Sequence, residues 1–218
     1  KLRFFTDISH EFRTPLTIIH GAIDRIMQSK NLSGDIKQPL SSLARNEQRM
    51  MRLINQLLEF RKMENGKLRL ALQQTDVVSF LHNIFNDFKE IADNKRITFL
   101  FQPQVKALDV CVDRGHLDKI AYNLLGNAFK YTPVGGSVSL KVAVDETARV
   151  FSLVVTDTGV GVSKEKQKSL FERFMQSSFT SNSMGIGLNL TRELVRVHKG
   201  TISYAENLPK GSIFTVTL

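Results

Sequence analysis

Residues 5–17 bring a histidine, a carboxylate and a hydroxyl together at spacings that suit transfer of a chemical group to an imidazole. Apolar residues recur in steps of three and four through the first 26 positions, which predicts an amphipathic helix. His10 is two residues away from apolar positions on both sides, so we expect it on the opposite, solvent-facing side. Glu11 adjoins it, Thr14 follows one turn later, and Pro15 weakens the helix there. An exposed imidazole beside a carboxylate on a loosened helix predicts a nucleophile that a reactive group can reach.

A second group of polar side chains lies on a helix predicted over 113–131. Asn123 and Asn127 are four residues apart, so their amides share one face of that helix. Lys130 lies about one turn further on, followed by Tyr131. Amide oxygens are reasonable ligands for a hard cation such as Mg²⁺, and a lysine can bind phosphate. The spacing favours a site for a metal ion and phosphate, whereas the plain alternative for asparagine in a helix is a surface residue.

Two glycine-rich stretches provide places where the backbone can approach a ligand closely. Asp157 follows an apolar strand and precedes Gly159 and Gly161, and an acid at a strand end can accept a hydrogen bond from an exocyclic amine. Gly185 and Gly187 open a predicted helix, whose first amides and positive dipole end suit phosphate. Taken alone, a Gly-x-Gly pattern is commonly just a turn.

Between these stretches, Phe171 and Phe174 are two aromatics three residues apart, and Leu188 follows the last glycine. A phenylalanine pair belongs more often to a core than to a site. A lone exposed histidine is most often only solvated. All of these stretches together, in one order in one chain, rarely arise by chance.

The composition is that of an ordinary globular protein large enough to bury a core. The 218 residues are 42% apolar and 23% charged. The one cysteine, Cys111, excludes an internal disulfide and favours a reducing compartment. No apolar run approaches the roughly 20 residues of a membrane span, and no signal peptide is recognisable. The formal charge of +9 comes without Trp and without a basic run interleaved with aromatics, so nucleic acid is not an expected partner.

Two long helices are expected to position His10. The first is predicted to run to about residue 29, a turn-rich break follows at 31–34, and a second amphipathic helix ends near Gly66. Such a hairpin cannot cover its own apolar stripes, so we expect a homodimer in which residues 1–66 form a four-helix bundle. Packing of the stripes against the rest of the chain is the alternative.

Strands and helices alternate beyond residue 66. Strands are predicted at 67–72, 97–101, 108–112, 138–144, 150–156, 201–204 and 212–218. Helices are predicted at 76–93, capped by Asp76, at 113–131, capped by Asp113, at 164–174 and at 187–198. The helices at 76–93, 113–131 and 187–198, with a run of mostly antiparallel strands, predict a two-layer α/β sandwich over residues 67–218.

Taken together, these stretches resemble the transmitter core of two-component sensor histidine kinases over essentially the full length of the chain. The stretch around His10 resembles the family's H-box. The stretches at 116–133, 157–161, 171–174 and 184–188 resemble its N-box, first glycine box, F-box and second glycine box, in that order. The chain is also similar to the cores of hybrid sensors. The resemblance implies a dimerisation and histidine phosphotransfer domain at 1–66, followed at 67–218 by an ATP-binding domain of the gyrase, chaperone and histidine-kinase type.

The resemblance assigns catalytic roles to the first stretch by position. His10 would be the phosphoacceptor. Glu11 would take the imidazole proton or orient the ring. Thr14 would help to place the water that dephosphorylates a partner regulator.

The same resemblance implies ATP and Mg²⁺ as cofactors. Asn123 and Asn127 would contact the phosphates and the metal, with Asn127 as the direct metal ligand. Lys130 would contact phosphate, Tyr131 would pack near the adenine or ribose, and Asp157 would bind the adenine amine. The remaining implied residues shape the pocket and its lid or anchor that lid to the core: Gly159, Gly161, Phe171, Phe174, Gly185, Gly187 and Leu188.

Two positions depart from the family pattern. Ser183 stands where the second glycine box often has its first glycine, so we expect a stiffer or altered lid that still binds phosphate. Gln176 stands where the family often has a basic residue, and Arg173 is the candidate to replace its contact with the γ-phosphate. We expect these departures to affect the kinase rate more than the fold.

Asn123 also bears on the type of reaction. In the related gyrase-type, chaperone and mismatch-repair ATPases, a glutamate one turn before the metal-binding asparagine activates water. An asparagine cannot act as a base, so we expect the γ-phosphate to meet an external nucleophile, and His10 is the obvious acceptor.

The expected function is therefore ATP-dependent autophosphorylation of His10, followed by transfer to an aspartate in the receiver domain of a response regulator. The alternatives are a protein that is mainly a response-regulator phosphatase, with Thr14 central, and a nucleotide-binding adaptor with a degenerate lid. The resemblance further implies the cytoplasmic portion of an inner-membrane sensor, attached to the membrane only through segments outside this sequence.

Overall fold

The computed structural model divides the chain into two compact units, Lys1–Lys67 and Leu68–Leu218. It describes residues 70–172 and 186–218 and, in the first unit, seven positions, all of them helical. These seven are Thr17, Ile19, Gly21, Ile26, Leu40, Leu43 and Met50. No helix within the described residues is long and apolar enough to cross a membrane. The predicted break at 31–34 and the predicted ends of both long helices lie outside the described residues.

The second unit is built on a five-stranded sheet with the strand order β2-β4-β5-β7-β6. Its strands are β2 (Thr98–Pro103), β4 (Ser137–Asp145), β5 (Val150–Asp157), β6 (Thr201–Glu206) and β7 (Ser212–Thr217). β2 runs parallel to β4, and the other neighbours are antiparallel. β7, the last strand in the sequence, therefore lies inside the sheet, and β6 lies at its edge.

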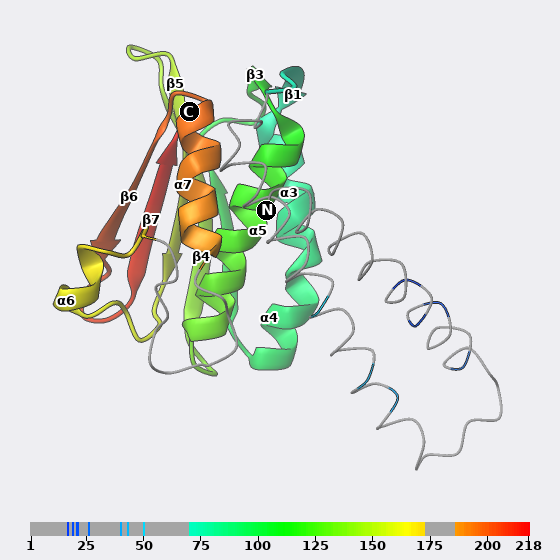
Figure 1. Cartoon of the computed structure of the whole chain (residues 1–218), viewed down its shortest axis with the longest axis vertical. Coiled ribbons are helices and arrows are strands. Elements are labelled where there is room, and N and C mark those ends of the chain that lie inside the picture. Colours follow the sequence, from blue (N-terminus) through cyan, green and yellow to red (C-terminus); the bar gives the residue numbers. More distant parts are fainter. Residues whose placement is uncertain are drawn as a thin grey trace, which may run out of the picture. The chain divides into compact units, whose positions relative to one another are not determined.

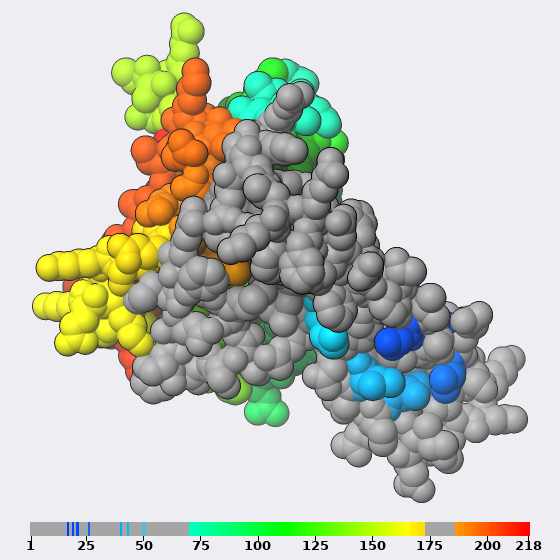
Figure 2. Space-filling view, viewed as in Figure 1, coloured from blue at the N-terminus to red at the C-terminus, as the bar shows by residue number. Residues whose placement is uncertain are grey.

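Helices cover one face of this sheet (Figure 1). They are α3 (Val77–Asp87), α4 (Lys89–Lys95), α5 (Arg114–Tyr131) and α7 (Gly187–Val197). In Figure 1, α7 lies beside α5, and α3 follows on the other side of α5. A separate two-stranded antiparallel sheet consists of β1 (Gln73–Asp76) and β3 (Asp109–Val112). The short α6 (Lys164–Gln167) belongs to the yellow projection on the surface in Figure 2.

The core of the second unit lies between the helices and the sheet. Along β4, Val138, Leu140 and Val142 are fully buried and alternate with partly exposed residues, as expected for a sheet with one covered face. On α5, Leu117 and Leu124 are fully buried, and burial of one such side chain contributes about 1.5–3 kcal/mol. This burial fixes the rotation of α5 about its axis and so the direction of its polar residues. The predicted two-layer α/β sandwich is confirmed.

The strand predicted at 67–72 is wrong in its described part. Residues 70–72 are not in a strand, and β1 begins only at Gln73. The backbone N–H of Ala71 donates to Oδ2 of Asp113 (2.8 Å) instead of to a neighbouring strand. Apolar residues do alternate in this stretch, but the backbone N–H of Ala71, which would pair with a neighbouring strand, is bound by the side chain of Asp113.

Two predicted helices are shorter than expected. The helix predicted at 76–93 is divided at Phe88, which is buried and stacks on Phe129 with ring centroids 5.4 Å apart. Within the described residues, the helix predicted at 164–174 spans only Lys164–Gln167 and continues as turns. The other predicted strands and helices of this unit are present with small shifts at their ends.

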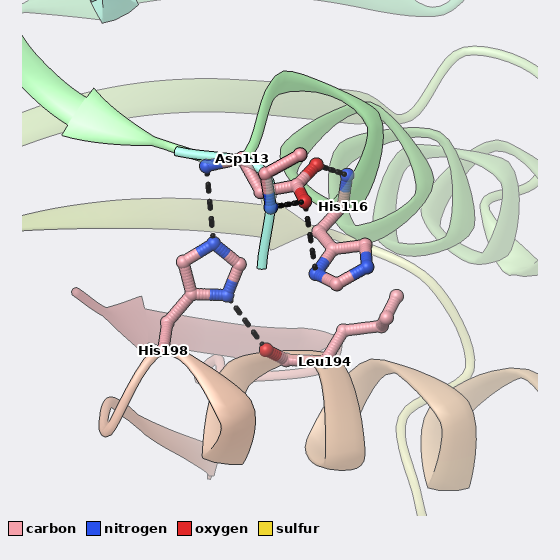
Figure 3. A network of polar contacts seen from close by, with 5 residues as sticks. Asp113, His116, Leu194 and His198 are labelled. Carbon is pink, nitrogen blue, oxygen red and sulfur yellow. Dashed lines mark hydrogen bonds and ion pairs between the residues drawn. The ribbon is translucent and has the colours of Figure 1, made fainter. Parts of the chain in front are cut away.

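Asp113 joins the start of α5 to the chain that enters this unit and to the end of α7 (Figure 3). Its Oδ1 accepts from the N–H of His116 (3.0 Å), so it caps α5 as predicted, and its Oδ2 accepts from Ala71. The N–H of Asp113 donates to Nε2 of His198 (3.3 Å), whose Nδ1 donates to the carbonyl of Leu194 (2.8 Å). Burial raises the pKa of Asp113, but the hydrogen bonds from Ala71 and His116 and the nearby histidines outweigh it, so the pKa lies below its ordinary value.

Candidate functional site

α5 presents the predicted amide pair at the margin of the core. Asn123 and Asn127 lie one turn apart and are partly buried, next to the fully buried Leu124. Lys130 lies in the last turn, with its Nζ 4.9 Å from the ring centroid of Tyr131. Asn123, Asn127 and Lys130 thus all lie in the C-terminal half of one helix.

Asp157 ends β5 and is buried, with 4% of its surface exposed. β4 and β7 pair with β5 on both sides, so two strand neighbours fix the position of this carboxylate. Its Oδ1 accepts from the N–H of Gly159 (2.7 Å), and Ser212 also donates hydrogen bonds to it. Burial raises the pKa of Asp157, against the lowering effect of the hydrogen bonds from Gly159 and Ser212. A buried carboxyl group held in this way can accept a hydrogen bond from a ligand amine.

The stretch after β5 connects Asp157 to the end of α5. The N–H of Val160 donates to the carbonyl of Tyr131 (3.3 Å), so two stretches predicted separately lie side by side. Gly161 has a φ of +70°, a left-handed conformation that favours glycine. The next N–H, that of Val162, donates to the hydroxyl of Tyr204 on β6 (3.2 Å). The predicted first glycine box is therefore bound to the sheet on both sides, through Asp157 and Val162, and to the end of α5 through Val160 between them.

The first turn of α7 lies against Asn123. A Cβ added at Gly187 would collide with the Asn123 amide, with Oδ1 nearest and Cγ 3.1 Å away, so this close approach requires a glycine. Nδ2 of Asn123 donates to Oγ1 of Thr191 (2.8 Å), which in turn donates to the carbonyl of Gly187 (3.0 Å). Ile186 is the cap residue at the start of α7, and its side chain makes no hydrogen bond to the first-turn amides.

Phe171 packs against the core. Its ring lies edge-on to Phe214, with centroids 6.5 Å apart, and its carbonyl accepts from Nδ2 of Asn189 on α7 (2.9 Å). Leu188 also packs against the core. The described residues on either side of 173–185 are therefore connected through Asn189.

Some predicted site residues lie outside the described residues. These are His10, Glu11, Thr14, Phe174 and Gly185. The positions that depart from the family pattern, Gln176 and Ser183, and the candidate replacement Arg173 also lie outside them. Their predicted roles stay predictions.

Four side chains that hold the site were not predicted from the sequence. Tyr204 binds the first glycine box, Ser212 donates to Asp157, and Nδ2 of Asn207 donates to the carbonyl of Asp157 (2.8 Å). Thr191 binds the amide of Asn123. A serine at the start of the last predicted strand and a threonine one turn into the last predicted helix were the available signals for two of them.

Family models match both parts of the chain. Residues 1–66 match the His Kinase A (phospho-acceptor) domain. Residues 112–218 match the histidine kinase-, DNA gyrase B-, and HSP90-like ATPase. The second match includes every described residue of the site built above.

Curated relatives match the whole chain and are much longer than it. Histidine kinase P4 of Formosa agariphila is 36% identical over 226 aligned residues, which cover 100% of this chain and 16% of that protein. Hybrid signal transduction histidine kinase D of Dictyostelium discoideum is 31% identical, with 100% of this chain and 15% of that protein covered. This chain therefore corresponds to one part of these two proteins.

Two solved structures of histidine kinases have a similar fold. Full-length ShkA in complex with AMPPNP has a TM-score of 0.82 at 25% identity, covering 100% of this chain and 45% of that one. The Acinetobacter baumannii histidine kinase AdeS has a TM-score of 0.67 at 24% identity, covering 96% of each chain, and this likeness concerns the fold. A phosphoacceptor domain precedes an ATPase domain in this chain, and the curated relatives align with it over its whole length. The chain therefore belongs to the sensor histidine kinases, as a transmitter core.

Proposed function

We propose that this chain uses ATP to phosphorylate its own His10 and passes the phosphoryl group to an aspartate in the receiver domain of a response regulator. The observation that carries the proposal is the arrangement around Asn123. The start of α7 approaches its amide closely, Asn127 lies one turn further along α5, and the buried Asp157 is linked to the end of the same helix. The phosphoacceptor model covers His10 in the same chain.

The described residues fit ATP. When bound, ATP supplies the γ-phosphoryl group, and Mg²⁺ neutralises part of its charge. Asp157, which is buried and accepts from Gly159 on one oxygen, would accept from the adenine amine. The first-turn amides of α7 would donate to phosphate oxygens at the positive end of the helix dipole. Asn127 would bind Mg²⁺ through its amide oxygen, and Lys130 would contact phosphate.

Asn123 is also the reason for assigning the acceptor role to histidine. Its carboxamide carries no titratable group, and its Nδ2 already donates to Thr191, so it cannot remove a proton from water. We therefore assign the acceptor role to His10. Glu11, its neighbour in sequence, would hold the imidazole proton or orient the ring.

We propose that the chain consists of two functional domains with a boundary between residues 66 and 67. Residues 1–66 would dimerise and carry His10, and residues 67–218 would bind ATP. Exposed apolar side chains at helical positions of the first unit support burial against a second copy, because 42% to 52% of each is accessible. They are Ile19, Ile26, Leu43 and Met50.

A second activity, dephosphorylation of the regulator, is proposed alongside the first. The autoinducer 2 sensor kinase/phosphatase LuxQ of Vibrio vulnificus is 30% identical over 99% of this chain and 26% of that protein. Thr14 would place the attacking water.

We also propose that the chain is the cytoplasmic portion of an inner-membrane sensor. Cys111 is exposed and forms no disulfide, which is compatible with the reducing compartment that this location implies.

A labelling experiment tests the proposal. The full chain is incubated with radiolabelled ATP and Mg²⁺ beside the control His10→Gln. We expect acid-labile, base-stable label on the wild type and none on the variant. Absence of label from wild type that binds nucleotide would refute the kinase activity.

A phosphorylated receiver domain added to the same proteins tests the second activity. We expect dephosphorylation by wild type and a large loss of it in Thr14→Ala, which should still acquire label on His10. Equal dephosphorylation by wild type and Thr14→Ala would refute the role of the threonine.

A further inference from the structure

We infer that Thr191 is a positioning residue that fixes the orientation of the Asn123 carboxamide, with the amide oxygen turned toward the start of α7. The inference rests on the proposed function in one respect, because it takes the start of α7 as the place where the nucleotide phosphates and Mg²⁺ bind. The inference concerns Thr191, which would contact neither the phosphates nor Mg²⁺. Thr191 acts only through Asn123.

The orientation follows from counting hydrogens. A threonine hydroxyl has one hydrogen to donate and lone pairs to accept. Oγ1 of Thr191 donates to the carbonyl of Gly187, four residues earlier in α7 (3.0 Å). Its only remaining role toward Asn123, 2.8 Å away, is that of acceptor. The atom of Asn123 at that distance must therefore be the nitrogen, and the oxygen must occupy the other side of the amide.

The environment removes the alternatives to this arrangement. Thr191 is 1% exposed, so water cannot replace either partner of its hydroxyl. A rotated carboxamide would place two oxygens 2.8 Å apart unless the hydroxyl gave up the Gly187 carbonyl. The β-branched side chain is also restricted about χ1, and a threonine rotamer in a helix is favoured by this bond to the carbonyl four residues back. In the observed orientation, Oδ1 is the Asn123 atom nearest to the place where a Cβ of Gly187 would lie.

An amide oxygen that faces the start of α7 favours a cation there. A carboxamide oxygen only accepts hydrogen bonds or binds cations, so it would be repelled by a bare phosphate. With Mg²⁺ present, the same oxygen can bind the ion or one of its waters. Without the Thr191 hydroxyl, the carboxamide could rotate and offer its NH₂ group to phosphate oxygens. Thr191 therefore makes nucleotide binding at this site depend on Mg²⁺.

The test measures binding of a non-hydrolysable ATP analogue to the full chain by calorimetry, in Mg²⁺ and in EDTA at matched ionic strength. The quantity of interest is the Kd in EDTA divided by the Kd in Mg²⁺. We expect this ratio to fall roughly five-fold in Thr191→Val, which has nearly the same shape but no hydroxyl. Thr191→Ser, which keeps the hydroxyl, should retain a ratio close to that of wild type.

The outcomes separate this inference from the proposed function. Equal weakening of binding in both buffers, or an unchanged ratio in Thr191→Val, overturns the inference, because a purely structural role would not distinguish the two buffers. A wild type that binds no nucleotide in either buffer overturns the proposed function and this inference with it.

A second measurement does not depend on the folding of the valine variant. In wild type, the carboxamide protons of Asn123 should exchange with solvent roughly ten-fold more slowly by NMR than those of Asn94, which is exposed. Equal exchange rates at the two asparagines would overturn the inference, because they would show that the hydrogen bond to Thr191 is not maintained.

Discussion

Replacement of Asp113 by alanine is expected to destabilise the second unit strongly, because one carboxylate holds two parts of the fold. The carboxylate caps the start of α5 by accepting from the N–H of His116, and loss of this hydrogen bond costs about 1 kcal/mol. Loss of the hydrogen bond from Ala71 to an ionised and buried oxygen costs about 1.5–3 kcal/mol. The sum is about 2.5–4 kcal/mol, a large share of the stability of a typical domain.

Asp113→Asn separates the two contributions. Asparagine is also a good helix cap, so its oxygen can still accept from His116. Its NH₂ group cannot accept from Ala71, where two donors would then face each other. We expect this variant to lose about 1.5–3 kcal/mol while α5 stays capped.

Tyrosine fluorescence can follow the unfolding of the second unit within the full chain. The chain has no Trp, and its three tyrosines are Tyr122, Tyr131 and Tyr204, all in that unit. In urea, we expect the midpoint of unfolding to fall by roughly 1–2 M in Asp113→Ala and by less in Asp113→Asn. A midpoint for the alanine variant within error of wild type would refute the role given to the carboxylate.

The pH dependence provides an independent check. The folded-state pKa of Asp113 lies below the value of 3.8 for the free side chain. Its contribution is therefore present above the unfolded pKa and is lost as the pH falls through the folded pKa. The difference in unfolding free energy between wild type and Asp113→Asn should shrink below about pH 4. A difference that stays constant from neutral to strongly acidic pH would contradict this account.

Three further predictions concern single side chains. Gly187→Ala should lower nucleotide affinity about ten-fold or more and should also lower the unfolding midpoint, because the new Cβ must displace the Asn123 amide from its hydrogen bond to the buried Thr191. Unchanged affinity in calorimetry would count against a site at this helix start. Asp157→Asn should lower the preference for ATP over inosine triphosphate about ten-fold, because an amide can donate to the inosine oxygen, and an unaltered preference would remove the adenine contact from this carboxylate. The hydrogen bond to Asp87 raises the pKa of Tyr122 to about 12. In an absorbance titration of the tyrosines, Tyr122→Phe should lack the ionisation at highest pH, and Asp87→Asn should shift that ionisation to lower pH. Identical titration curves for wild type and Asp87→Asn would disprove the pairing.

The parts of the fold that could be predicted from the sequence are those encoded locally. Asp113 was predicted to cap a helix that ends at Tyr131, and α5 has these bounds and this cap. Asn123 and Asn127 were placed on one face from their spacing alone, which requires only the geometry of a helix. Asp157 was placed at the end of a strand because an apolar run stops there, and β5 ends at that residue.

The parts that could not be predicted depend on partners distant in the sequence. The amide of Ala71 binds a carboxylate 42 residues away, so a local alternation of apolar residues did not become a strand. Thr191 binds Asn123 across 68 residues, and its place one turn into a predicted helix does not by itself identify the amide that it binds. The predicted helix is divided at Phe88, and the ring of Phe88 stacks on Phe129 of α5, a partner 41 residues further along the chain that the local pattern does not indicate.

The position of β7 has a consequence for how the domain forms during synthesis. β7 comes last in this sequence but pairs with β5 on one side and β6 on the other, so β6 has no strand neighbour in the sheet until β7 arrives. Its first residue is Ser212, which donates to Asp157. On the ribosome, α5, β4 and β5 can pack early, but the carboxylate end of the site gains its last partner only when this strand emerges. Completion of the sheet and completion of the site are therefore a single, late event.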